Sequence, residues 1–170
     1  MESIQAFLQD WLKDATRLAV LGAGSTLRSD DAAGMVITER LADLFPQDQY
    51  PALLFCPGET APENYSGKIR TFAPTHLLVL DAADVGLEPG AITVIPHESV
   101  GGPTFCSHML PLRVMINYLT DQIGATSALV GIQYQSLEFD GEMTDEIKTA
   151  VDELAGLLES AFEDKWGQKE

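Results

Sequence analysis

Three side chains from distant parts of the chain have the types that could bind one divalent metal ion together. They are Asp31, Asp81 and His108. Each follows the end of a different segment that is expected to form a strand. Asp81 follows its strand directly, whereas Asp31 and His108 are separated from theirs by a loop. A mixed set of two carboxylates and one imidazole suits a borderline cation such as Ni²⁺ or Zn²⁺. Three protein ligands would leave coordination positions open for water or substrate.

Each of the three also has a simpler structural interpretation. Asp81 ends the apolar run of residues 77–80, where an unpaired carboxylate is costly. It could bind a metal, accept backbone hydrogen bonds, take part in acid–base chemistry or act as a cap. The pair Asp30–Asp31 would favour the macrodipole of a following helix, which alone explains one of the two acids. His108 precedes an expected helix and could cap it, as could Ser107.

The glycines that follow the first apolar run could indicate a dinucleotide site or a tight turn. Gly22 and Gly24 match the start of the fingerprint G-x-G-x-x-G, but Leu27 stands at its third glycine. The second expected strand ends in Phe55-Cys56-Pro57 and not in the acid that would bind a ribose, and the acids at residues 30–31 would repel a pyrophosphate. We therefore favour a tight turn between strand and loop.

The remaining nucleophiles and ligands do not form a known catalytic motif. Cys106 is two residues from His108, but the sequence has no second Cys/His pair that would complete a zinc site. Cys56 and Cys106 are therefore interpreted as small buried hydrophobic residues. His76 and His97 are interpreted as surface or rim residues. The chain contains no Gly-x-Ser-x-Gly elbow and no His-Glu-x-x-His helix, which argues against a serine hydrolase or a zincin.

Composition narrows the class of protein further. The chain has 170 residues, and 10 Lys and Arg against 26 Asp and Glu give a net charge of −16. So acidic a chain is not expected to bind nucleic acid or an anionic membrane surface. No apolar run reaches the ~18 residues of a membrane span, and the N-terminus lacks the cationic start of a signal peptide. Two cysteines fit the reducing cytoplasm.

The elements that must position these residues follow from hydrophobic periodicity. Continuous apolar runs predict strands, and apolar residues at helical spacing predict helices. The expected strands are residues 18–21, 52–56, 77–80, 91–95 and 125–133. The expected helices are residues 2–13, 33–45, 61–71, 111–123 and 147–162, the last with Thr144 as its cap. The pattern predicts one α/β domain over residues 1–170, with a mostly parallel sheet between two helical layers.

Several of these segments together resemble the [NiFe]-hydrogenase maturation endopeptidases. The opening motif of that family reads roughly G-x-G-N-x-x-x-G-D-[DE]-x-x-G, and residues 21–34 read LGAGSTLRSDDAAG. The match continues through GETAPE at 58–63, LDAADVGLEPG at 80–90, SHMLPL at 107–112 and GIQ at 131–133. It spans about residues 17–160 and is most similar to the branch that processes the large subunit of hydrogenase 3. The helix at residues 2–13 lies outside it as an N-terminal extension.

This resemblance implies an activity, a substrate and a site. The family removes a C-terminal extension from the hydrogenase large-subunit precursor after nickel insertion. Carried over by position, the nickel-contacting residues are Asp31, Asp81 and His108. The precursor would supply the nickel, so that the metal is a recognition element; zinc or cadmium could substitute. We expect a cytoplasmic monomer whose mechanism uses either the metal or a carboxylate to activate water.

The chain departs from the family pattern at three positions of the opening motif. Ser25 replaces the usual Asn, Ser29 the usual Gly, and Ala32 a residue that is often Gly. Serine at position 29 narrows the backbone freedom of the loop that presents Asp31. An alternative function is a non-catalytic, nickel-dependent binding module or chaperone for the large subunit, because no obvious nucleophile is present.

Overall fold

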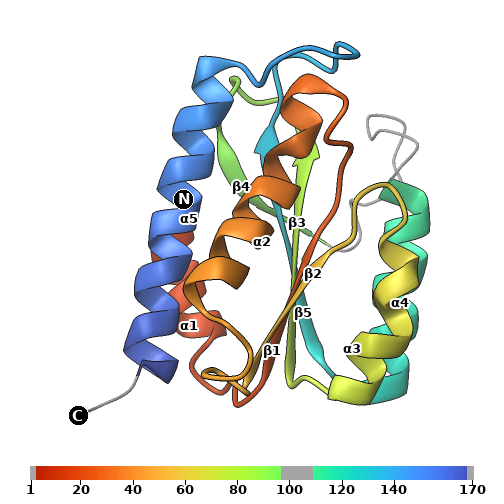
Figure 1. Ribbon diagram of the computed structural model, residues 1–170, viewed down its shortest axis with the longest axis vertical. Coiled ribbons are helices and arrows are strands. Elements are labelled where there is room, and N and C mark those ends of the chain that lie inside the picture. Colours follow the sequence, from red (N-terminus) through yellow and green to blue (C-terminus); the bar gives the residue numbers. More distant parts are fainter. Residues whose placement is uncertain (1–2, 97–108, 168–170) are drawn as a thin grey trace.

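A five-stranded sheet forms the centre of the computed structural model, which describes residues 3–96 and 109–167 (Figure 1). The strand order is β2-β1-β3-β5-β4. The first four strands are mutually parallel, and β4 pairs antiparallel with β5 at one edge. The bounds are β1 Leu18–Gly22, β2 Leu53–Pro57, β3 His76–Ala83, β4 Ile92–Ile95 and β5 Thr126–Gln133.

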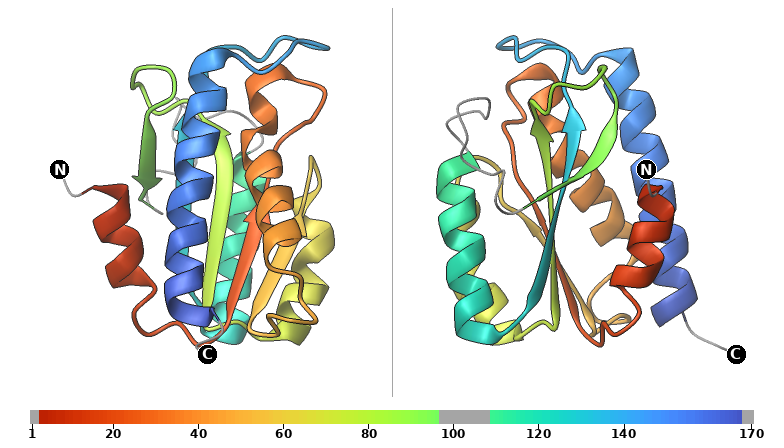
Figure 2. Two further views of the ribbon diagram at one scale, coloured as in Figure 1. Left: turned by 60° about the vertical axis from the view of Figure 1, so that its left-hand side comes forward. Right: turned by 180° about the vertical axis from the view of Figure 1, so that it is seen from behind.

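Helices cover both faces of this sheet (Figure 2). One face carries α1, α2 and α5, and the other carries α3 and α4. The helices are α1 Ile4–Trp11, α2 Ala33–Leu44, α3 Ser66–Phe72, α4 Met109–Ile123 and α5 Asp145–Trp166, with 3₁₀ helices η1 Ser29–Ala32 and η2 Pro62–Tyr65. The predicted α/β fold with helical layers on both sides of a mostly parallel sheet is therefore confirmed.

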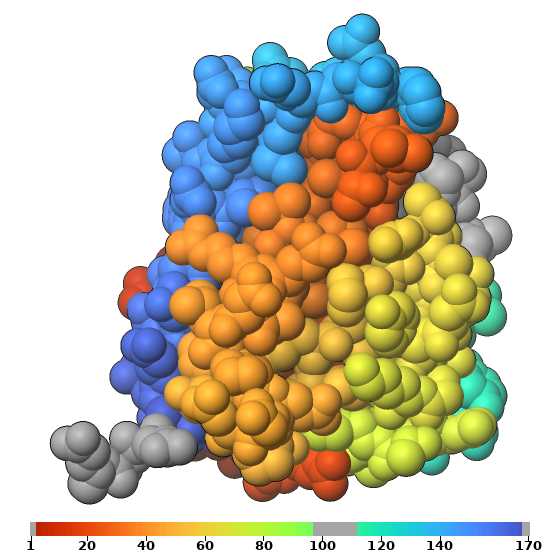
Figure 3. Space-filling model, viewed as in Figure 1, coloured from red at the N-terminus to blue at the C-terminus, as the bar shows by residue number. Residues whose placement is uncertain are grey.

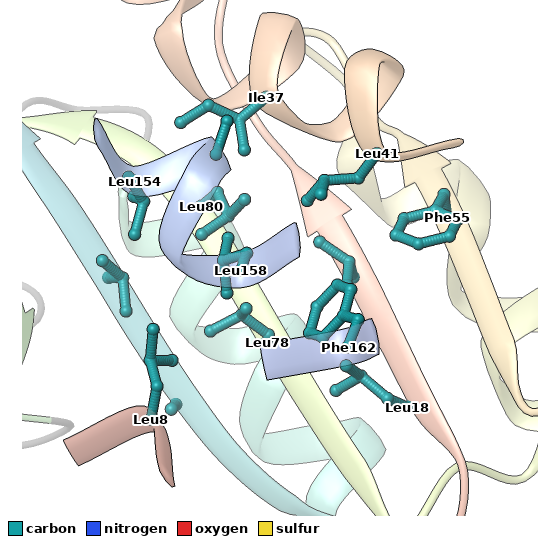
Figure 4. Close-up of a cluster of buried hydrophobic side chains, with 14 of the residues drawn as sticks. Leu8, Leu18, Ile37, Leu41, Phe55, Leu78, Leu80, Leu154, Leu158 and Phe162 are labelled. Carbon is teal, nitrogen blue, oxygen red and sulfur yellow. The ribbon is translucent and has the colours of Figure 1, made fainter. Parts of the chain in front are cut away.

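Two hydrophobic cores lie on the two faces because the strands are apolar at successive positions. Leu18 and Val20 of β1 belong to the core under α1, α2 and α5. Ala19 and Leu21 belong to the core under α3 and α4. Figure 4 shows the first core, in which Phe162 of α5 lies among side chains of the strands and of α2. Each fully buried large side chain of this kind contributes roughly 1.5–3 kcal/mol relative to its exposed state.

Three sequence-based expectations are corrected by the structure. His76 begins β3 as expected but is buried rather than on the surface, because its ring packs edge-on against Trp11 of α1 at 4.9 Å between ring centroids. Burial lowers the pKa of His76. Strand β3 continues to Ala83, so Asp81 lies inside the strand rather than at its end. Helix α4 begins at Met109, before the predicted start at Pro111.

The predicted N-terminal helix is present and forms part of the first core. Ser3 caps α1, since its hydroxyl oxygen accepts a hydrogen bond from the Ala6 amide at 3.1 Å. Leu8 is buried in the core, and Phe7 packs against it. None of the helices within residues 3–96 and 109–167 has the length and apolar character needed to cross a membrane.

Candidate functional site

The candidate site lies where the connections that follow the parallel strands meet. The arrowheads of β3 and β5 point to the same end of the sheet in Figure 1. Residues 23–32 connect β1 to α2 at this end, and residues 134–144 connect β5 to α5. The carboxyl edge of a parallel sheet is the usual place for functional groups, because several connections converge there.

Asp81 is a buried carboxylate in the middle strand of the sheet. It pairs with Gly131 of β5 and is 5% exposed. Burial, followed by the negative charge of Asp31, raises the pKa of Asp81 to about 8, although a hydrogen bond with the Ala82 backbone lowers it. Asp81 is therefore mostly protonated at neutral pH, and a cation placed beside it would favour release of that proton.

Asp31 lies in η1, which packs against β3, the strand that carries Asp81. Its Oδ2 accepts a hydrogen bond from the Ser25 amide at 2.8 Å, so that its own loop orients the carboxylate. It is close enough to Asp81 for its charge to act on the pKa of that group. The structure thus brings together two acids that are fifty residues apart in the sequence.

The third predicted ligand, His108, lies outside the described residues, as do His97 and Cys106. Helix α4 begins at Met109, the residue that follows His108. This helix packs on the face of the sheet that includes Val79 and Ala83, and Asp81 has the same parity along β3. Because side chains alternate along a strand, Asp81 is directed to the face that α4 covers.

Asp30 differs from its neighbour because its carboxylate is saturated by protein donors. It is fully buried, whereas Asp31 is half-buried. The donors to Asp30 are the amides of Gln135, Ser136 and Thr144 and the hydroxyl of Thr144. The macrodipole that favours this acid is that of α5, whose N-cap is Thr144, and not that of its own helix.

The glycines of the opening motif are explained by close packing and by an unusual backbone conformation. A Cβ atom at Gly34 would overlap the carbonyl oxygen of Leu80 in β3. A Cβ atom at Gly22 would overlap the Thr38 hydroxyl and the Gly34 carbonyl oxygen. Gly24 has φ +125°, which L residues rarely adopt. These glycines bring α2 against the ends of β1 and β3 and form the tight turn expected from the sequence.

Ser29 occupies the position where the family pattern has glycine. Its φ is +42°, in the left-handed region that glycine adopts without strain. Its hydroxyl donates a 2.7 Å hydrogen bond to the Glu142 carbonyl oxygen. The added bond offsets part of the backbone cost of serine at this position.

Gln133 organises the segment after β3 and was not recognised as a site residue from the sequence. Its Oε1 accepts hydrogen bonds from the amides of Val85 at 2.8 Å and Leu87 at 3.2 Å. Its Nε2 donates to Asp84 at 3.4 Å. Gln133 ends the strand that neighbours Asp81, and it fixes the chain that leaves the site. The only sequence signal was its place in the GIQ segment.

No group of three His, Cys, Asp or Glu side chains suited to a metal ion occurs within the part of the chain that the structure describes. Asp31 and Asp81 provide two oxygen donors, and a complete set would need a third. Cys56 does not provide it, because burial raises the pKa of its thiol to about 12 and it is fully enclosed in the second core. The interpretation of Cys56 as a small buried hydrophobic residue is confirmed.

Comparisons with known proteins identify the family to which the chain is similar. The sequence model of the hydrogenase maturation protease family matches residues 37–161. Hydrogenase 3 maturation protease of Escherichia coli K12 is 35% identical over 141 residues, which cover 82% of this chain and 87% of that protein. A putative hydrogenase maturation protease of Methanocaldococcus jannaschii is 27% identical over 165 residues, covering 95% and 97% of the two chains.

Solved structures give the same result. The crystal structure of a [NiFe] hydrogenase maturation protease from Thermococcus kodakarensis superposes with a TM-score of 0.84 and 31% identity, covering 92% of this chain and 99% of that one. The crystal structure of a hydrogenase 3 maturation protease has a TM-score of 0.71 and 32% identity, covering 83% and 88%. The resemblance found in the sequence is thereby confirmed: the chain belongs to the hydrogenase maturation protease family and is a hydrolase that acts on peptide bonds.

Proposed function

We propose that this endopeptidase removes the C-terminal extension of a [NiFe]-hydrogenase large-subunit precursor after nickel has been inserted, and that it recognises the bound nickel. The observation that carries the proposal is the pair formed by Asp31 and Asp81. Asp31, held in its loop by the Ser25 amide, lies close to Asp81, which is buried without a positive partner among the described residues. A divalent cation at this place would compensate both charges.

The proposed ligands for the nickel are Asp31, Asp81 and His108. Two carboxylate oxygens and one imidazole nitrogen suit Ni²⁺, and Zn²⁺ or Cd²⁺ could substitute. The first residue of α4 directly follows His108, and α4 covers the face toward which Asp81 is directed. The precursor brings the metal, so that nickel belongs to the substrate and serves as a checkpoint.

The metal would discriminate between loaded and empty precursor because no positive side chain within residues 3–96 and 109–167 forms an ion pair with either acid. An empty precursor would face Asp81 in its protonated state and gain no metal–ligand bonds. A loaded precursor would displace the proton of Asp81 and gain two carboxylate ligands. The bound metal would then polarise the scissile carbonyl or activate water, or a carboxylate would act as general base.

The proposed setting of this reaction is the cytoplasm, with the enzyme as a monomer. The two cysteines, too few for a disulfide scaffold, support a reducing compartment. The acidic surface would favour encounter with basic segments of the precursor.

Cleavage of nickel-loaded and nickel-free precursor tests the proposal. Mass spectrometry should detect loss of the C-terminal extension only from the loaded precursor. Asp81→Asn should abolish cleavage, and Asp121→Asn, which changes an exposed carboxylate at the far end of α4, should leave it intact. Equal cleavage of both precursors, or full activity of Asp81→Asn, would refute nickel recognition at this site. A stable complex without cleavage would indicate a chaperone.

A further inference from the structure

We propose that Asp30 is a positioning residue, through which the β5–α5 connection holds Asp31 in the orientation needed at the site. The inference rests on the proposed role of Asp31 and extends it to residues more than a hundred positions away. Residues 134–144 would thus act as a brace for the loop that carries the functional acid. Neither Asp30 nor the brace needs to touch the substrate.

The first support is the complete set of hydrogen bonds to the Asp30 carboxylate. Oδ2 accepts from the amides of Gln135 at 2.9 Å and Ser136 at 2.8 Å. Oδ1 accepts from the amide of Thr144 at 2.7 Å and from its hydroxyl at 3.0 Å. The donors come from both ends of the connection, so one side chain joins its beginning to its end. Hydrogen bonds to a charged group are about twice as strong as neutral ones.

The second support is that Thr144 serves Asp30 and not its own helix. Thr144 occupies the N-cap position of α5, but its side chain makes no capping hydrogen bond to that helix. Its hydroxyl points instead to Asp30. The partial positive charge at the start of this long helix also favours the buried carboxylate. The N-cap residue of α5 therefore binds Asp30, which lies more than a hundred residues earlier in the sequence.

The third support is that the brace also forms backbone hydrogen bonds with residues just N-terminal to Asp31. The Asp140 amide donates to the Leu27 carbonyl oxygen at 2.8 Å, and the Asp30 amide donates to the Ser136 carbonyl oxygen at 3.2 Å. Figure 3 shows residues of the brace lying over the outer end of the β1–α2 connection.

The hydrogen bonds of Asp31 itself are local. Its amide donates to the Arg28 carbonyl oxygen and its carboxylate accepts from Ser25, both within its own loop. The peptide bond between Asp30 and Asp31 is thus the direct link from the brace to the functional carboxylate. Movement of Asp30 would rotate or shift Asp31 relative to Asp81.

Two substitutions at Thr144 separate positioning from folding. Thr144→Val removes the hydroxyl donor to Asp30 but keeps the amide donor and the side-chain shape, and it removes no cap from α5. Thr144→Ser keeps the hydroxyl and serves as the matched control. Asp30→Asn places an amide nitrogen opposite backbone N–H groups and is the stronger perturbation.

Steady-state cleavage of nickel-loaded precursor and calorimetric titration of the isolated protein with Cd²⁺ are the two readouts. We expect Thr144→Val to lower kcat about tenfold and Asp30→Asn about 100-fold, the loss that a shift of about 1 Å can cause. In both variants KM should change less than kcat, and Cd²⁺ should bind more weakly than to wild type. Thr144→Ser should keep the wild-type kcat and the wild-type affinity for Cd²⁺. Circular dichroism would verify that each variant is folded.

The outcomes distinguish this inference from the proposed function. Failure of the wild-type protein both to cleave loaded precursor and to bind Cd²⁺ would refute the proposed function, and the inference would fall with it. Wild-type cleavage combined with unchanged kcat and Cd²⁺ affinity in Thr144→Val would refute the inference alone. A lower melting temperature without a change in kcat would assign Asp30 a purely structural role. If Asp30→Asn does not fold, the Thr144 pair still decides.

Discussion

Replacing Asp81 by asparagine should make the protein more stable, and increasingly so as the pH rises. Asn has nearly the same shape as Asp and can still accept a hydrogen bond from the Ala82 backbone. It removes only the charge that the buried site disfavours. The expected gain therefore depends on how far the folded state resists ionisation of the wild-type carboxyl group.

The size and sign of this effect follow from the pKa of Asp81, which the fold raises from 3.8 to about 8. Below pH 4 the group is protonated in both states and contributes no penalty. As the pH rises from 4 to 8, the unfolded chain ionises while the folded chain retains its proton, so folding stability is progressively lost. Each pH unit in this window corresponds to about 1.4 kcal/mol, which gives at most about 4 kcal/mol between pH 5 and pH 8.

Urea denaturation at pH 5, 6, 7 and 8 would measure this difference. The free energy of unfolding of Asp81→Asn minus that of wild type should increase steadily with pH and become constant above about pH 8. Asp121→Asn, at an exposed position, controls for general charge effects. A difference that is the same at all four pH values, or that falls toward pH 8, would refute the argument that burial and Asp31 keep Asp81 protonated.

Three further predictions concern the packing around the site. Gly34→Ala places a Cβ against the Leu80 carbonyl oxygen and should move α2 away from β3. Urea denaturation should show a free energy of unfolding lower by about 1–3 kcal/mol, and cleavage should slow. Wild-type values for both stability and cleavage would contradict this. Phe162→Ala opens the first core and should cost about 3–5 kcal/mol in unfolding free energy, with cleavage retained below the melting temperature; a loss under about 1 kcal/mol would show that Phe162 is not packed as described. Cys56, whose thiol pKa is raised to about 12, should resist iodoacetamide at pH 8 in the folded protein and react in urea, as followed by peptide mass spectrometry; rapid labelling of the native protein would contradict its burial.

The sequence predicts the fold well because its strands are continuous apolar runs. Residues 18–21 can hardly be anything other than a buried strand, and the structure extends this strand by only one residue, to Gly22. Strand β3 is the instructive case, since its apolar run stops at Leu80 although the strand continues to Ala83. Pairing with β5 through Gln133 extends the strand across Asp81. A buried carboxylate within a strand is therefore specified by the neighbouring strand and not by local periodicity.

The site divides in the same way into local and non-local parts. That Asp31 and Asp81 lie close together can be predicted, because the carboxyl ends of parallel strands share one edge. The role of Asp30 cannot, because its partners lie more than a hundred residues further along the chain, at Gln135, Ser136 and Thr144. The burial of His76 also depends on a distant residue, Trp11 of α1. These contacts depend on tertiary packing, which a pattern along one segment does not encode.

Anomalous diffraction from crystals soaked in Zn²⁺ would test the proposed metal site most directly. A single ion should lie about 2.0–2.2 Å from a carboxylate oxygen of Asp31 and of Asp81 and about 2.0–2.1 Å from a ring nitrogen of His108. An ion bound elsewhere, or one held by only one of these three side chains, would contradict the claim that they form a single site for the metal of the substrate.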